Sequence, residues 1–152
     1  MRRWQSLLVL ATVAVGGIVV LTACGGSGGK QLSKQEFLKQ ANAICKDATA
    51  AGNAVSPPTK AAEFSNYAKA AEPLLEKELV DLRRLKPPTS LEADVNAWLA
   101  TGDEAVKALD KMIQVNGDEA KITELLGQAN SSAVKSDALG KKLGLTQTHC
   151  VG

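Results

Sequence analysis

The chain has 152 residues, enough for one domain of ordinary size, and 45% of them are hydrophobic, which excludes a chain that is disordered throughout. Lysine and arginine number 18 against 16 acidic residues, and the net charge is only +2. This balance argues against nucleic-acid binding, because neutralising phosphates needs clustered basic residues. A single histidine leaves few metal ligands, and we expect neither a metal nor another cofactor.

The first 23 residues have the organisation of a secretory leader. Arg2 and Arg3 form a short positive segment, and an uncharged, mostly apolar run follows from Ser6 to Ala23. The run ends in Leu21-Thr22-Ala23-Cys24, which resembles a bacterial lipobox, in which the cysteine is lipidated and becomes the new N-terminus. The alternative is an uncleaved anchor helix, because about 18 apolar residues are near the minimum for a membrane span.

Both interpretations place the rest of the chain outside the cytoplasm, since the two arginines favour the inner face of the membrane. We therefore expect a cleaved signal peptide (1–23), a lipidated Cys24 with a glycine-rich tether (24–32), and a helical domain (33–152). The expected location is the cell membrane, where the protein is lipid-anchored and faces the extracytoplasmic side.

Assigning Cys24 to the lipid leaves two cysteines, Cys45 and Cys150. An even pair outside the cytoplasm predicts a disulfide. The bond would close a loop of roughly 105 residues, for which chain-entropy models give an upper figure of nearly 5 kcal/mol. The alternative is a reactive Cys150 thiol with His149 as its base, although sequence neighbours rarely meet in the geometry that this chemistry needs.

After the tether, apolar residues recur at helical spacing and no alternating strand pattern occurs, which predicts an all-α domain. The first helix is expected to begin at Ser33, with Glu36 completing a capping box, and to end at Gly52. A second helix is expected from Thr59 as N-cap to the proline pair at 87–88. Pro73 lies inside it, so we expect a kink or a break nearby.

The third helix is expected to begin with another capping box, Thr89 with Glu92, and to end at a tight turn around Gly117. The fourth begins at Asp118 as N-cap and ends at Gly144. Four amphipathic helices with short connections predict an up-down-up-down four-helix bundle. In that topology the C-terminal tail can reach the first helix and form the disulfide.

Signals of catalysis are weak, and we do not expect an enzyme. Acidic residues of the second helix alternate with lysine, and this pattern predicts a solvated face rather than a carboxylate site. The residues concerned are Glu72, Glu76, Lys77, Glu78 and Asp81. No phosphate-binding loop, nucleophile elbow or zinc-ligand spacing occurs.

Small side chains gather in the middle of the fourth helix, with bulky aromatic residues expected nearby. Close helix packing explains this arrangement, but an apolar pocket with a few hydroxyl groups is the alternative. The candidate ligand-facing residues are Tyr67, Trp98, Ala129, Ser132, Ala133 and Ser136.

Several segments together resemble uncharacterised small helical-bundle lipoproteins that are common in actinobacteria. The resemblance rests on the lipobox, on Phe37-x3-Ala41-Asn42-Ala43-Ile44-Cys45, on Leu79-x2-Leu82-x2-Leu85-Lys86-Pro87-Pro88 and on Gly144-Leu145-x4-Cys150. It implies a secreted, lipid-anchored bundle with a Cys45–Cys150 bridge, and it transfers no functional residue. The expected function is a non-enzymatic module that binds an envelope protein or a small ligand, with a carrier of an apolar ligand as the alternative.

Overall fold

The computed structural model describes residues 30–115, 117–146 and 150–151. Within these residues the chain is all-helical, as predicted, and no strand occurs. The four helices are α1 (Lys34–Gly52), α2 (Phe64–Arg83), α3 (Glu92–Gln114) and α4 (Glu119–Leu143), with short 3-10 turns η1 (Ala61–Glu63) before α2 and η2 (Thr89–Leu91) before α3.

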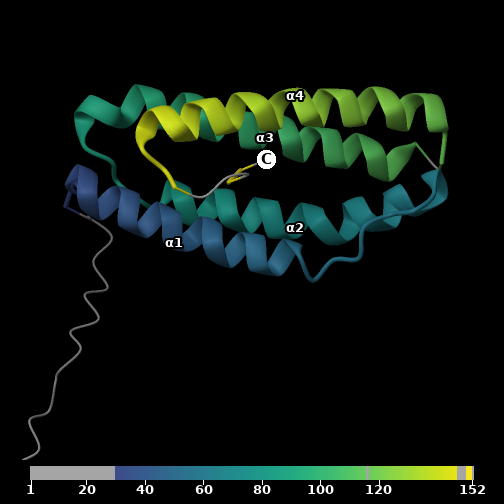
Figure 1. The fold of residues 1–152 in the computed structure, drawn as a ribbon, viewed down its shortest axis with the longest axis horizontal. Helices are drawn as coiled ribbons and strands as arrows, with labels where there is room; N and C mark the ends of the chain where they lie inside the picture. The colour runs from purple at the N-terminus through teal and green to yellow at the C-terminus, as the bar shows by residue number, and fades with distance from the viewer. Residues whose placement is uncertain (1–29, 116, 147–149, 152) are drawn as a thin grey trace, which may run out of the picture.

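The helices alternate in direction along the bundle, and each packs against the next one in the sequence (Figure 1). The C-terminal tail turns back after α4 and lies between α4 and α1 (Figure 1). The tail therefore fills the space where α1 and α4 would otherwise meet in a closed four-helix bundle.

Three helix ends are set by the residues predicted for them. The Ser33 N–H donates to Glu36 Oε2 at 2.9 Å and the Glu36 N–H donates to Ser33 Oγ at 3.3 Å, which completes the capping box. The Asp118 side chain caps α4 through the Lys121 N–H at 3.2 Å. Gly144 ends α4 in the left-handed region, with φ of 99°.

The starts of α2 and α3 differ from the prediction, because the side chains of both expected capping threonines bind other partners. Thr59 does not cap α2: its N–H and hydroxyl donate to the Glu63 carboxylate at 2.7 and 3.0 Å, and α2 begins only at Phe64. The Thr89–Glu92 capping box does not form either, and the Thr89 hydroxyl instead accepts from Gln31 Nε2 at 2.8 Å. In both places a 3-10 turn leads into the helix.

Helix α2 continues through Pro73 without a break. Proline removes the N–H that would bond to the carbonyl of Lys69, one turn earlier. Both residues are exposed, so water can hydrate that carbonyl, and the helix continues without the break that the sequence allowed.

The bundle makes its first contacts slightly before the expected domain boundary at residue 33. The Leu32 N–H donates to the Lys86 carbonyl at 2.9 Å, and Gln31 reaches Thr89 as described. Residues 31 and 32, which were predicted to belong to the tether, are thus fixed to the connection between α2 and α3.

The buried apolar residues form two clusters. The larger one surrounds the disulfide and includes Phe37, Trp98 and the tail residues Leu145 and Val151. The smaller one lies toward the other end of the bundle around Ala68, Met112 and Leu125. The larger cluster can pack this closely because position 102 has no side chain. A Cβ on Gly102 would lie 2.5 Å from Leu79 Cδ2 and 3.1 Å from Val151 Cβ.

Candidate functional site

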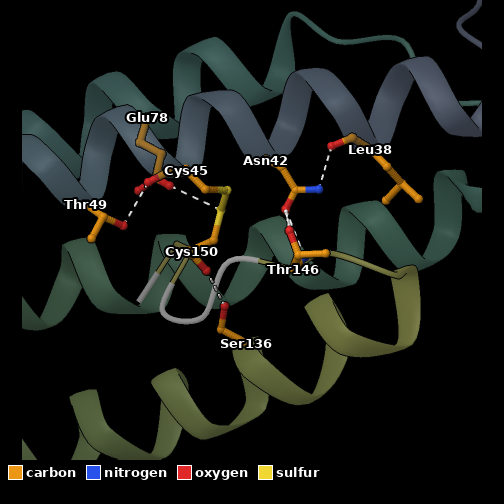
Figure 2. Close-up of a disulfide and its surroundings, with 8 residues drawn as sticks. All are labelled: Leu38, Asn42, Cys45, Thr49, Glu78, Ser136, Thr146 and Cys150. Carbon is orange, nitrogen blue, oxygen red and sulfur yellow. Dashed lines mark hydrogen bonds between the residues drawn. A yellow bond between two sulfur atoms is a disulfide. The ribbon is translucent and has the colours of Figure 1, made fainter.

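Cys45 and Cys150 form the predicted disulfide, with their Cα atoms 5.1 Å apart (Figure 2). Cys45 is fully buried on α1 and Cys150 is buried in the tail. The bond consumes the thiol that the alternative of a Cys150 nucleophile needs, and His149 of that alternative lies outside the described residues.

Polar contacts hold the tail on both sides of the disulfide (Figure 2). The Ser136 hydroxyl of α4 donates to the Cys150 carbonyl at 2.7 Å. Asn42 Oδ1 of α1 accepts from the Thr146 N–H at 2.8 Å and from its hydroxyl at 3.0 Å. Asn42 Nδ2 in turn donates to the Leu38 carbonyl at 2.8 Å, which fixes the orientation of its amide.

Glu78 lies directly beside the disulfide, and only 7% of it is exposed. Its Oε1 atom is 3.3 Å from Cys150 Sγ, and the carboxyl also accepts the Val151 N–H (Figure 2 shows the side chain against the sulfur atoms). Burial raises the pKa of Glu78 to about 7, although the Val151 N–H acts in the opposite direction. Near neutral pH the group is therefore balanced between its two forms.

The burial of Glu78 corrects the prediction that the acidic residues of this helix form a solvated face. Glu76, Lys77 and Asp81 are exposed or half-buried, as that prediction requires, but Glu78 is not. The missed signal is its position: Leu75, Glu78 and Leu82 follow each other at spacings of three and four, so Glu78 belongs to the apolar stripe.

An apolar cavity of about 310 Å³ lies between the helices on the side of Glu78 away from the tail. All four helices contribute to it, and Leu126, which is 40% exposed, lies at its rim. The lining residues are Ala48, Gly52, Val55, Phe64, Tyr67, Ala71, Leu74, Leu75, Glu78, Ala105, Leu109, Met112, Leu126 and Ala129. Glu78 is the only ionisable carboxyl among them.

A second cavity of about 290 Å³, here called the acidic cavity, lies between α1 and α2. It is lined by Ile44, Asp47, Ala48, Ala51, Leu74, Lys77, Glu78 and Asp81. The two cavities share Ala48, Leu74 and Glu78, so the Glu78 side chain lies where an apolar space meets a polar one.

The structure separates the aromatic residues proposed as ligand-facing. Tyr67 lines the apolar cavity, and so does Ala129 of α4. Trp98 instead packs in the cluster around the disulfide, where it is 1% exposed. Its indole N–H is buried without a hydrogen-bond partner among the described residues.

The other residues of that set do not line the apolar cavity. Ser132 donates to Glu104 Oε2 at 2.8 Å, on the outer side of α3 and α4. Ser136 binds the tail carbonyl, as described above. Ala133 is half-buried between the two serines. The tail explains the difference, because it occupies the space toward which this part of α4 was expected to open.

Cys45, Glu78 and Cys150 bring three potential metal ligands within 4.8 Å of one another. A metal needs the cysteines as thiolates, and here their sulfur atoms are bonded to each other. In its disulfide form the cluster offers a single carboxylate, which does not suffice for a metal centre.

The predicted signal peptide and Cys24 lie outside the described residues. Among the residues that are described, no helix combines the length and the apolar character needed to cross a bilayer. Comparisons with protein-family models, with curated proteins and with solved structures found no match to the chain.

Proposed function

We propose that the protein is a non-enzymatic module, tethered to the membrane through Cys24 on the extracytoplasmic side, that binds a small and mostly apolar molecule inside its helical bundle. The observation that carries this proposal is the apolar cavity of about 310 Å³ between the four helices. Its size falls within the range of small-molecule sites, at the lower end.

The volume bounds the ligand. A dry cavity of roughly 150 Å³ takes up one benzene molecule, so about 310 Å³ corresponds to roughly a dozen non-hydrogen atoms. Along α2 the lining runs from Phe64 to Glu78, which at 1.5 Å per residue is about 21 Å. An elongated molecule, such as a medium-length alkyl chain, suits this shape better than a compact one.

Native mass spectrometry of the full chain, released gently from its own membranes, tests both parts of the proposal. We expect a mass increase at Cys24 from acylation and a second, non-covalent mass that disappears on collisional activation. A spectrum without lipid on Cys24 would contradict the anchor.

The site is tested by filling it. Ala129→Trp should abolish the non-covalent mass, because the indole would occupy the cavity. Ala138→Trp is the matched control, since Ala138 is exposed on the same helix. Retention of the same mass by Ala129→Trp, or its loss from both variants alike, would contradict the assignment of the ligand to this cavity.

A further inference from the structure

The Glu78 side chain lines both cavities. On one side lies the apolar cavity, whose other lining residues are apolar apart from the hydroxyl group of Tyr67. On the other side lies the acidic cavity, with Asp47 and Asp81 in its wall. One buried polar group at the end of an apolar space fixes the orientation of a bound molecule.

Within residues 30–115, 117–146 and 150–151, no basic side chain pairs with this carboxyl. Lys77 lines the acidic cavity, but its ammonium group pairs with Asp81 at 2.5 Å and its side chain is 76% exposed. Asp81 also pairs with Arg84, at 3.0 Å. In the part of the chain that the structure describes, the carboxyl contacts the Val151 N–H and the Cys150 sulfur, neither of which carries a positive charge. A buried carboxylate without a counter-charge costs free energy, and a bound cation would relieve that cost.

Resting on the function proposed above, we infer that the ligand is an amphiphilic cation, whose alkyl body lies in the apolar cavity and whose ammonium group contacts Glu78. The ammonium group then lies at the junction with the acidic cavity, where Asp47 adds negative potential, whereas the charge of Asp81 is compensated by Lys77 and Arg84. A carboxylate of the same length would place like charges together at Glu78. An alcohol would fill the cavity and can donate to the carboxylate, but it brings no positive charge to it.

Three probes of equal chain length separate the head group from the body: decylamine, decanol and decanoate. Each probe is dialysed at pH 8 against phosphatidylcholine vesicles that carry the full chain. The amount of probe bound to protein-free vesicles is subtracted from the amount bound to these vesicles. We expect decylamine to bind at least about tenfold more tightly than decanol, because only its ammonium group adds a positive charge to the hydrogen bond with Glu78. Decanoate should bind more weakly than decanol.

Glu78→Gln keeps the shape of the side chain and removes its charge. It should reduce the preference for decylamine over decanol to less than about threefold, mainly by weakening the binding of decylamine. Asp47→Asn, at an exposed position, should weaken decylamine binding by about two- to threefold and does not disturb the interior.

The outcomes are distinguishable. If decanol binds but decylamine binds no more tightly, or if Glu78→Gln keeps the full preference, the inference about the head group is wrong and the cavity remains a binding site. If none of the three probes binds above the protein-free vesicles, both the inference and the proposed function are wrong.

Discussion

In the interior of the bundle, Oε1 of Glu78 lies 3.3 Å from Sγ of Cys150, so a buried carboxyl contacts the bond that joins α1 to the C-terminal tail. In its protonated form the carboxyl can donate to the sulfur, which is a weak acceptor. The Glu78 side chain also lines both cavities. The stability of the disulfide end and the proposed binding site therefore share one titratable group.

The first prediction concerns the pH dependence of stability. Burial raises the pKa of Glu78 from 4.5 to about 7, so between these pH values the folded chain holds a proton that the unfolded chain has released. The stabilisation is complete below about pH 4.5 and is lost as the pH rises through 7. A shift of this size corresponds to at most about 3 kcal/mol.

Glu78→Gln should remove this contribution, so the wild type should lose stability relative to the variant between pH 5 and pH 8. Chemical denaturation of both proteins at several pH values measures the difference, in which the other titrating groups cancel. If the free energies of unfolding of the two proteins change with pH in the same way, Glu78 does not titrate in this range.

The second prediction concerns Gly102, where the helices α2 and α3 and the tail meet closely. Gly102→Ala should destabilise the protein by about 1–3 kcal/mol, because the new methyl group would overlap Leu79 and touch Val151. Gly127→Ala is the matched control, because Gly127 is exposed on α4 with open space around it. This substitution should raise the free energy of unfolding by about 0.5–1 kcal/mol. Equal effects of the two substitutions on thermal unfolding would contradict the close approach at Gly102.

The third prediction concerns the disulfide. Replacing both Cys45 and Cys150 by alanine should cost about 2–5 kcal/mol of unfolding free energy. The backbone amides of Leu145 and Thr146, which donate to Gly140 and Asn42, should then exchange with solvent much faster. Reduction of the wild type should reproduce both effects. Unchanged exchange at these two amides would mean that packing alone holds the tail.

The fourth prediction concerns the hydroxyl that holds the tail from α4. Ser136→Ala should cost about 1–3 kcal/mol, because it leaves the buried Cys150 carbonyl without its donor. Ser131→Ala, at an exposed position of the same helix, should change stability by less than about 0.5 kcal/mol. If both variants unfold at the same denaturant concentration, the hydrogen bond from Ser136 to the Cys150 carbonyl does not stabilise the protein, and water replaces it.

The sequence predicts those parts of the fold that depend on neighbouring residues. Ser33, Asp118 and Gly144 end helices through local hydrogen bonds or backbone conformation, and they do so as expected. Thr59 and Thr89 are also common capping residues, but Thr59 binds Glu63 instead and Thr89 accepts from Gln31. A capping residue is thus predictable only where no other side chain competes for its hydroxyl.

The candidate site was predictable only in part, because it depends on where the tail lies. Tyr67 and Ala129 line the apolar cavity as expected of a pocket, whereas Trp98 and Ser136 are covered by tail residues. Glu78 resembles its solvated neighbours in the sequence. Its burial follows from Val151 and Cys150, which approach it from 72 or more residues away.

The insertion of the tail between α1 and α4 also orders the folding of the chain. Helices α2, α3 and α4 are sequence neighbours and can pair through short connections, which is fast. Helix α1 pairs with α2 locally, but its buried face around Cys45 is complete only when Leu145, Cys150 and Val151 arrive, after a loop of 105 residues has closed. We therefore expect a nascent chain to complete this face of α1 only after its last segment is free.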